Sequence, residues 1–330
     1  MNKDAQDYHQ HQEDYEDVEI KELQHSEFPK SWISGNYQLN PVSLSDFLEE
    51  DIPERKMMMS PWLPEGGICM IYASRGIGKT YFALEIAVAV ATGKPFHNWA
   101  VESRKRVLYI DGEMCQSDLQ SRFKKTCGDN FVIDDDYFGI VTPERQQYGS
   151  PDISNALWFK SLDETTAQYD LIIVDNISTL CRGGNENDAE SWSIVQEWAI
   201  NLRSKGKAVV FIHHAGKGGN QRGTSKREDV MDTVIALKRP EDYRTMEGAR
   251  FIVSFEKARH FSGSDAEPFE MKLVSNDSIH GWTVSNLPED NYQKYQNLDK
   301  TGMKDKDVAE QLGLSKASIS KYKCRALQES

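Results

Sequence analysis

The segment from Ala73 to Thr80 reads Ala-Ser-Arg-Gly-Ile-Gly-Lys-Thr, a composition suited to binding phosphate. An apolar run precedes it and an apolar-periodic run follows it, so it is predicted to join a strand to a helix. Backbone N–H groups of such a loop cradle phosphate oxygens, and the residues concerned are Ser74, Arg75, Gly76, Ile77, Gly78, Lys79 and Thr80. Lys79 is expected to reach the β- and γ-phosphates of ATP, and Thr80 to place its hydroxyl on Mg²⁺.

Ala73 departs from the phosphate-loop pattern G-x-x-x-x-G-K-[ST], which has glycine at that position. Alanine tolerates a positive φ less well than glycine, so the entry turn is the weak point of the motif. A chance glycine-rich turn is the alternative interpretation. The flanking strand and helix patterns favour the nucleotide site.

Two further apolar runs end in acids. Asp175 follows the run Leu171–Val174, and Asp111 and Glu113 follow the run Val107–Ile110. Ligands bind at the carboxyl ends of parallel strands, so Asp175 is expected to help hold Mg²⁺ and Glu113 to orient the attacking water, with Asp111 as its competitor. A helix-capping role for Asp175, and ordinary loop positions for the other two, are the alternatives.

A histidine pair ends a fourth apolar run, where His213 and His214 follow Val209–Ile212. At that strand end His213 is expected to hydrogen-bond the γ-phosphate and report its loss to the next loop. A metal site would need a third ligand, and none stands at suitable spacing. A structural histidine is the other alternative.

Cations gather in two places downstream. The segment 215–227 is rich in glycine and free of acids, and its cations Lys217, Arg222, Lys226 and Arg227 suit contact with a nucleic-acid backbone. An exposed flexible loop is the alternative. Lys257 and Arg259 stand two residues apart after a predicted strand, where they are candidates for an arginine finger toward an adjacent subunit. Simple surface charges are the alternative there.

Short apolar runs alternate with helical patterns over the middle of the chain. Predicted strands are 67–72, 106–110, 137–141, 170–175 and 207–212, and predicted helices are 79–92, 116–127, 152–168 and 187–204. This order predicts an α/β fold with a mostly parallel sheet covered on both faces. Four later runs, at 234–237, 251–255, 269–273 and 282–284, indicate an antiparallel extension of that sheet.

Composition sets limits on compartment and partners. The 330 residues carry a formal net charge of −13, which argues against a nucleic-acid-binding surface over the whole molecule. Five dispersed cysteines favour reduced thiols and a cytoplasmic location over a disulfide scaffold or zinc site. No signal-peptide layout or membrane-length apolar run is present, so no membrane partner is expected.

The chain divides into five segments by composition. Residues 1–31 are an acidic arm without periodicity, expected to be disordered. Residues 32–60 form a lead-in segment with scattered apolar positions. The main domain is expected over 61–285, a polar linker over 286–300 and a small helical module over 301–330.

The motifs of the main domain, in this order, resemble the RecA-like P-loop ATPase core, and within it the RepA-type hexameric helicase family related to DnaB and KaiC. The segments that carry the resemblance are Trp62–Gly67, Arg75–Thr80, Asp111–Glu113, Val174–Asp175, His213–Lys217 and Arg222–Ser225. It covers about residues 62 to 282. Asn176 departs from the pattern, because a second acid often stands there.

The resemblance implies a homo-oligomeric ring, a hexamer, with ATP between subunits and single-stranded DNA in the pore. It also implies Glu113 as the catalytic carboxylate, Asp175 as the metal partner and His213 as the sensor. The finger is left open among Arg259, Lys257 and Arg222.

The C-terminal segment 306–322 resembles a helix-turn-helix. Gly313 suits the end of one helix, and Ser315 suits the N-cap of the next. Lys316, Ser318 and Lys321 would then point outward toward duplex DNA. A packing module without DNA contact is the alternative.

Together these features indicate an oligomeric, ATP- and Mg²⁺-dependent DNA helicase or translocase that acts in replication of a plasmid, phage or other mobile element. The first alternative is a DNA-binding regulator in which ATP controls assembly and the C-terminal module finds an operator. A KaiC-like signalling ATPase is the further alternative.

Overall fold

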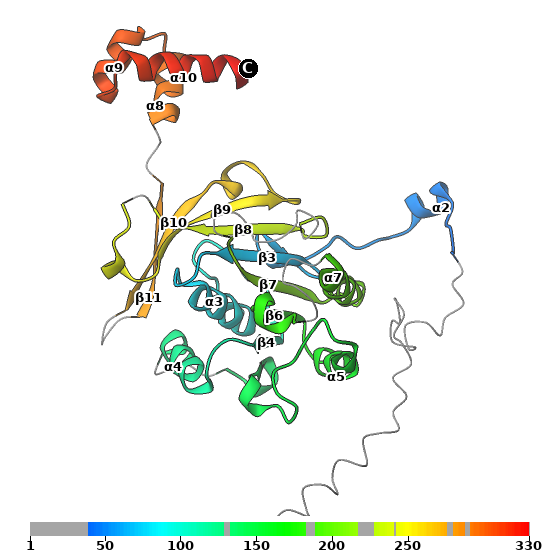
Figure 1. Cartoon of the computed structure of the whole chain (residues 1–330). Coiled ribbons are helices and arrows are strands. Elements are labelled where there is room, and N and C mark those ends of the chain that lie inside the picture. The colour runs from blue at the N-terminus through cyan, green and yellow to red at the C-terminus, as the bar shows by residue number, and fades with distance from the viewer. Residues whose placement is uncertain are drawn as a thin grey trace, which may run out of the picture.

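A mixed sheet of nine strands forms the centre of the part of the chain that the computed structural model describes, residues 39–128, 133–182, 189–216, 228–240, 242–275, 280–287 and 291–329 (Figure 1). The strand order is β11-β10-β9-β8-β3-β7-β6-β4-β5. The bounds are β3 Ile68–Ala73, β4 Val107–Asp111, β5 Phe138–Val141, β6 Leu171–Asp175, β7 Ala208–His214, β8 Thr233–Lys238, β9 Arg250–Ala258, β10 Phe269–Ser275 and β11 His280–Asn286.

Six neighbouring strands of this sheet, β8 to β5 in the order above, run parallel. β9, β10 and β11 continue the sheet in antiparallel pairs from β8. The predicted α/β class, with a mostly parallel sheet and an antiparallel extension, is therefore confirmed. Every predicted strand is present, and the ends lie within a few residues of the predicted ones.

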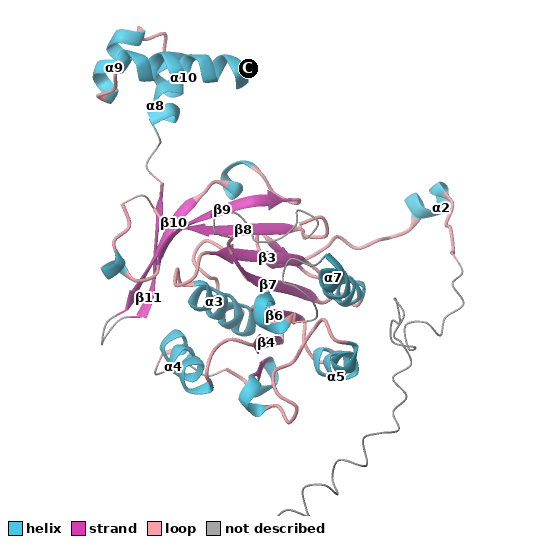
Figure 2. Ribbon diagram, in the orientation of Figure 1, coloured by secondary structure: helices cyan, strands magenta, loops and turns pink. Residues whose placement is uncertain are grey.

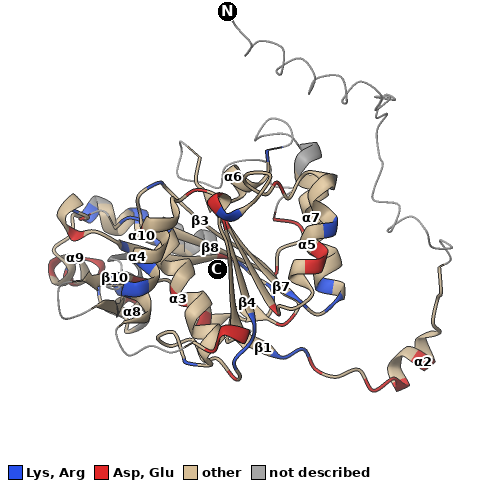
Figure 3. Ribbon diagram, turned by 90° about the horizontal axis from the view of Figure 1, so that it is seen from below, with Lys and Arg blue, Asp and Glu red and all other residues tan. Residues whose placement is uncertain are grey.

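Helices cover both faces of the sheet, which Figure 3 shows edge-on between α3 and α4 on one side and α5 and α7 on the other. Their bounds are α3 Lys79–Thr92, α4 Gln116–Cys127, α5 Ala156–Thr166, α6 Ile177–Leu180 and α7 Ala189–Ser204. Figure 2 shows them with the short 3₁₀ turns Asp135–Tyr137, Pro143–Arg145, Thr245–Glu247 and Gly263–Ala266. Two short strands, β1 Met57–Met59 and β2 Leu63–Pro64, pair with each other beside the sheet.

The alternation of side chains along each strand builds two separate cores. Val210 and Ile212 of β7 pack with helix α3, whereas Val209 and Phe211 pack with helix α7. Both sides of the parallel strands are thus buried, which explains why these strands are continuous apolar runs. On the α3 side, the fully buried ring of Phe82 contacts the rings of four aromatic residues, Phe96, Trp99, Phe251 and Trp282.

The segment before the sheet has two parts. Met58 and Met59 of β1 are buried in the core on the α3 side. Helix α2, Leu44–Glu49, has no buried residue and stands away from the sheet in Figure 1. Its apolar side chains are exposed, as are those beside it: Leu39, Val42, Leu44, Phe47, Leu48 and Ile52. The predicted acidic arm, 1–31, lies outside the described residues.

Three helices form a separate small core at the C-terminal end: α8 Asn291–Lys300, α9 Asp305–Leu312 and α10 Lys316–Glu329. The sequence pattern predicted a linker over 286–300, and helix α8 corrects this. Tyr295 is 1% exposed and packs with Val308 and Ile319, so the apolar positions of α8 find their partners only in the next two helices. The polar sequence of α8 alone therefore does not predict a helix, because the packing that stabilises this helix involves residues of α9 and α10.

All five cysteines are free thiols. In the described part of the chain, no helix combines the length and the apolar character that crossing a bilayer requires.

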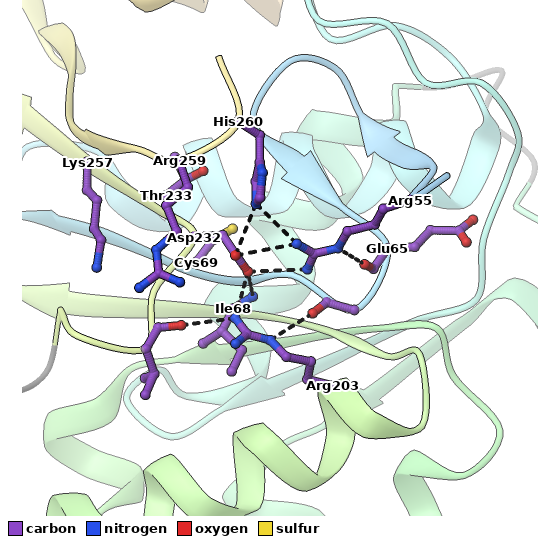
Figure 4. A network of polar contacts seen from close by, with 12 residues as sticks. Arg55, Glu65, Ile68, Cys69, Arg203, Asp232, Thr233, Lys257, Arg259 and His260 are labelled. Atoms are coloured by element: carbon purple, nitrogen blue, oxygen red, sulfur yellow. Dashed lines mark hydrogen bonds and ion pairs between the residues drawn. The ribbon is translucent and has the colours of Figure 1, made fainter. Parts of the chain in front are cut away.

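Asp232 is the centre of a polar network at the edge of the sheet where β3 begins (Figure 4). Its carboxylate accepts hydrogen bonds from Arg203 at 2.7 Å, from Arg55 at 3.3 Å and from the backbone N–H of Ile68 at 3.0 Å, and it lies 3.2 Å from Nε2 of His260. Burial alone raises the pKa of Asp232, but these donors outweigh it and hold the pKa at about 2. The network ties the lead-in segment to β3 and α7.

Replacing Asp232 with asparagine is expected to lower the free energy of unfolding at pH 7 by about 2 kcal/mol. A carboxylate whose pKa is depressed by folding stabilises the protein above its unfolded pKa of about 3.9 and loses that effect as the pH falls toward the folded value. Urea denaturation at a series of pH values measures this. The difference between the two proteins should narrow below pH ~4, and a difference independent of pH would contradict the role given to Asp232.

Candidate active site

The phosphate loop lies where β3 ends and α3 begins. Gly76 and Gly78 take positive φ values of 71° and 115°, and Gly78 is the N-cap of α3. Ala73 is the last residue of β3 and is buried, and its φ is not among the positive values of the described residues. The departure at Ala73 therefore costs nothing, because this position is extended strand and needs no glycine.

Lys79 points back over this loop. Its ammonium donates to the carbonyl of Ser74 at 3.0 Å and to that of Ala73 at 3.3 Å, and the residue is 7% exposed. Burial lowers its pKa, while the charges of Asp175 and Glu113 act in the opposite direction. A buried ammonium held by two neutral carbonyls is ready to exchange them for anionic phosphate oxygens.

Asp175 ends β6 at the same edge of the sheet. It is 2% exposed, and Tyr109 of β4 donates its hydroxyl to Oδ2 at 2.7 Å. Burial raises the pKa of Asp175, and hydrogen bonds from Tyr109 and Thr80 oppose that rise. The contact with Thr80 places a hydroxyl and a carboxylate oxygen together beside the phosphate loop, the hard donor atoms that Mg²⁺ prefers.

The two acids that follow β4 have different surroundings. Asp111 is fully buried, its Oδ2 accepts from the backbone N–H of Met114 at 3.0 Å, and burial raises its pKa to about 7. The Glu113 side chain is 49% exposed. Glu113 is thus the acid that can reach bound water, while Asp111 holds the turn on which Glu113 stands.

His214, rather than His213, joins this group. Nε2 of His214 lies 3.5 Å from Oε2 of Glu113, and burial lowers the pKa of His214, with the charge of Lys79 adding to the effect. His213 is fully buried on the opposite face of β7, because consecutive strand residues point to opposite faces. His213 is the sensor predicted from the sequence, and this geometry moves that candidate role to His214.

Lys257 and Arg259 lie at the far edge of the sheet from the phosphate loop. Thr233 of β8 pairs with Cys69 near the start of β3 and with Ala258 at the end of β9. The ammonium of Lys257 donates to the carbonyl of Glu228, and the guanidinium of Arg259 donates to the carbonyl of Asp229 at 2.6 Å. Figure 4 shows both cations near Asp232. The length of β3, roughly 17 Å, separates these cations from the phosphate loop of their own chain.

The candidate DNA contacts fall in two groups. Lys217, Arg222, Lys226 and Arg227 lie outside the described residues. Lys316 and Lys321 are exposed on α10, whereas the hydroxyl of Ser318 lies 3.0 Å from that of Ser315. The backbone N–H of Ser318 also donates to Ser315 Oγ at 3.1 Å, which supports the predicted N-cap.

Two residues of the site have no role predicted from the sequence. Arg239, directly after β8, donates to the carbonyl of Gly76 at 3.2 Å and stacks over the ring of Tyr243 at 3.8 Å. Asn176 is fully buried and donates to Glu113. The sequence signal for Arg239 was a cation at the carboxyl end of a central strand, where ligands bind. Its contact with Gly76 could not be predicted, because the two residues are 163 positions apart in the sequence.

ATP and Mg²⁺ fit the residues present. Lys79 and the backbone of the loop would hold the phosphates, and Thr80 and Asp175 would hold the metal ion, which would neutralise charge on the phosphate oxygens. Oδ1 of Asp111, which pairs with Asp175 on the neighbouring strand, is buried with no hydrogen-bond partner among the described residues, and a bound polar group would satisfy it. The arrangement suits transfer of a phosphoryl group to water.

Comparisons with known proteins show which family profile the chain matches and which proteins it resembles. A sequence profile described as an AAA domain matches residues 36–220. The chain is 24% identical over 217 residues to the DNA repair protein RadA of Aquifex aeolicus (strain VF5). That match covers 63% of this chain and 41% of RadA, so the chain spans about two fifths of the length of this relative. A KaiC-like protein from Pyrococcus horikoshii OT3 aligns with a TM-score of 0.47 and 15% identity, over 70% of this chain and 99% of the other.

Replacing Gly78 with alanine tests the loop geometry. The new Cβ would lie 2.7 Å from Cβ of Ala249, at a φ of 115° that alanine disfavours, so the loop must shift. We expect the affinity for a fluorescent ATP analogue to fall about tenfold or more, a loss of roughly 1.4 kcal/mol.

Gly149 provides the matched control, because it also has a positive φ, of 78°, but a Cβ added there would meet nothing within 4 Å. The Gly149→Ala variant should bind the analogue as the wild type does. Equal binding by the Gly78→Ala variant would contradict the site.

Proposed function

The chain belongs to the AAA domain family and is a P-loop ATPase of the RecA-like class, and on this basis we propose that it is an oligomeric DNA translocase or helicase of the RepA type. It would hydrolyse ATP with Mg²⁺ to act in replication of a plasmid, phage or other mobile element. The observation that carries the proposal is the meeting of Lys79, Asp175 and Glu113 at one edge of the sheet.

Each of these residues has a distinct part in the proposed hydrolysis. Lys79 neutralises charge on the phosphates, and Thr80 with Asp175 forms the metal side of the site. Glu113 orients the attacking water and accepts its proton, because it is the exposed acid beside the loop. His214 contacts Glu113 and directly precedes the segment 215–227 in the sequence, and it is the proposed sensor of the γ-phosphate.

Two features of the structure support assembly into an oligomer, for which the resemblance suggests a hexamer. Lys257 and Arg259 are too far from their own phosphate loop to serve it, but a neighbouring subunit could present its ATP to that edge. Helix α2 exposes an apolar surface that includes Leu44, Phe47 and Leu48 and that no other part of the described chain buries, and a neighbouring subunit would bury it.

Contact with DNA is supported by charge and by relationship. Four cations follow the proposed sensor in the sequence, within the segment 215–227, and Lys316 and Lys321 are exposed on α10. RadA, a relative of this chain, is named as a DNA repair protein. Several C-terminal modules in one oligomer would add their weak individual affinities.

A DNA-binding regulator is the second candidate. The observation that favours it is the C-terminal three-helix module, in which Gly313 ends α9 in the left-handed conformation and Ser315 caps α10. In this alternative, which resembles a helix-turn-helix protein, ATP would control assembly and α10 would find a duplex operator.

ATP turnover measured with and without single-stranded DNA tests the proposal. We expect DNA to raise kcat several-fold and the Lys79→Ala variant to lose activity by about 100-fold or more, because it lacks the charge that stabilises the phosphates. Lys160→Ala is the matched control, because the Lys160 side chain is 90% exposed and should leave turnover unchanged.

Equal turnover with and without single-stranded DNA, joined with a footprint on one duplex sequence, would favour the regulator. Light scattering with a non-hydrolysable ATP analogue should give an oligomer. A monomer under those conditions would contradict the roles of Lys257 and Arg259.

A further inference from the structure

Asn176 occupies a position between the proposed base and the proposed sensor. It follows β6 directly, and its side chain is fully buried. The amide nitrogen Nδ2 donates to Oε2 of Glu113 and lies 3.3 Å from Nε2 of His214. One amide thus contacts both groups, whose own nearest atoms are 3.5 Å apart.

The backbone around Asn176 is fixed from several directions. Its carbonyl accepts from the N–H groups of Thr179 and Leu180 at 3.2 Å and 3.1 Å, and from the Thr179 hydroxyl at 3.1 Å. The side chain of Asn176 makes no capping hydrogen bond to α6. Its amide is therefore available for Glu113 and His214. The side chain therefore projects from a fixed point into the site.

The turn that carries Glu113 packs closely against the same helix. The N–H of Gly112 donates to the carbonyl of Asp175 at 2.8 Å. A Cβ at Gly112 would lie 2.6 Å from Cγ of Leu180 and 2.7 Å from Oγ1 of Thr179. This close approach sets the distance from which Asn176 reaches the Glu113 carboxylate.

The chemistry of an amide suits the space between these two groups. A carboxylate only accepts hydrogen bonds, and in the neutral tautomer in which Nε2 of His214 carries no hydrogen this nitrogen also accepts, so the two atoms then repel each other. The amide group supplies two N–H donors, one for each acceptor. A carboxylate in place of Asn176 would supply none and would add a negative charge beside Glu113.

We propose that Asn176 is a positioning residue that sets the orientation of the Glu113 carboxylate and couples it to His214. This inference rests on the proposed ATP hydrolysis and adds a part to it. Asn176 acts through Glu113 and is assigned no contact with phosphate or metal. Its loss should therefore slow hydrolysis while leaving the nucleotide bound as before.

The test compares kcat and the Kd for ATP in the full-length chain with the Asn176→Ala and Asn176→Asp variants. We expect kcat to fall about 10- to 100-fold in both variants, and the Kd to change by less than about threefold. Asn155→Ala is the control: Asn155 is exposed and caps α5, so this variant should lose some stability but keep kcat.

A double-mutant cycle separates positioning from a merely structural role. In the Glu113→Gln background the Asn176→Ala change should lower kcat by no more than about twofold further, because the group through which it acts is already disabled. The Asn176→Asp variant conserves side-chain volume and gives the same comparison if the alanine variant does not fold.

Independent, multiplicative losses in the cycle, or wild-type kcat in both Asn176 variants, would overturn the inference while leaving the proposed function intact. A wild-type chain without ATP turnover would instead remove the proposed function itself. The two failures are therefore distinguishable by the wild-type rate alone.

Discussion

The register of four neighbouring parallel strands is the constraint on which the site depends. Asp111 pairs with Asp175, Asp175 pairs with Ile212, and Ala73 pairs with His214. These pairings bring the ends of β4, β6, β7 and β3 to one edge of the sheet, although Ala73 and His214 are distant in the sequence. A shift of one residue in any pair would turn its polar end to the opposite face, as His213 and His214 illustrate.

Polar groups are buried at this edge at a cost that their neighbours offset. Asp175 is nearly inaccessible to solvent, and hydroxyl donors from β4 and from the first turn of α3 stabilise its carboxylate. The ammonium of Lys79 lies near enough for the two charges to favour each other. The apolar runs that precede these residues build the two cores, and the cores in turn hold the polar ends in place.

Much of the fold followed from local patterns. The apolar runs and the strand–loop–helix motif predicted the parallel strands, helix α3 and the placement of Lys79 and Asp175, because each depends on periodicity within a few residues. Three features did not follow. The choice between His213 and His214 depends on which face α3 covers, the contact of Arg239 with Gly76 joins distant segments, and α8 needs partners from α9 and α10. Each depends on tertiary packing, which a single sequence leaves open.

Every role given to these residues presupposes that a nucleoside triphosphate binds at the carboxyl edge of the parallel strands with a metal ion beside it. Isothermal titration of the full-length chain with ATP, in buffer with Mg²⁺ and again with EDTA, is the decisive experiment. We expect one ATP per chain with Mg²⁺ and an affinity at least about tenfold weaker without it, since Thr80 and Asp175 would then face the phosphates with no metal between them. Absence of any binding heat in the presence of Mg²⁺ would contradict the site.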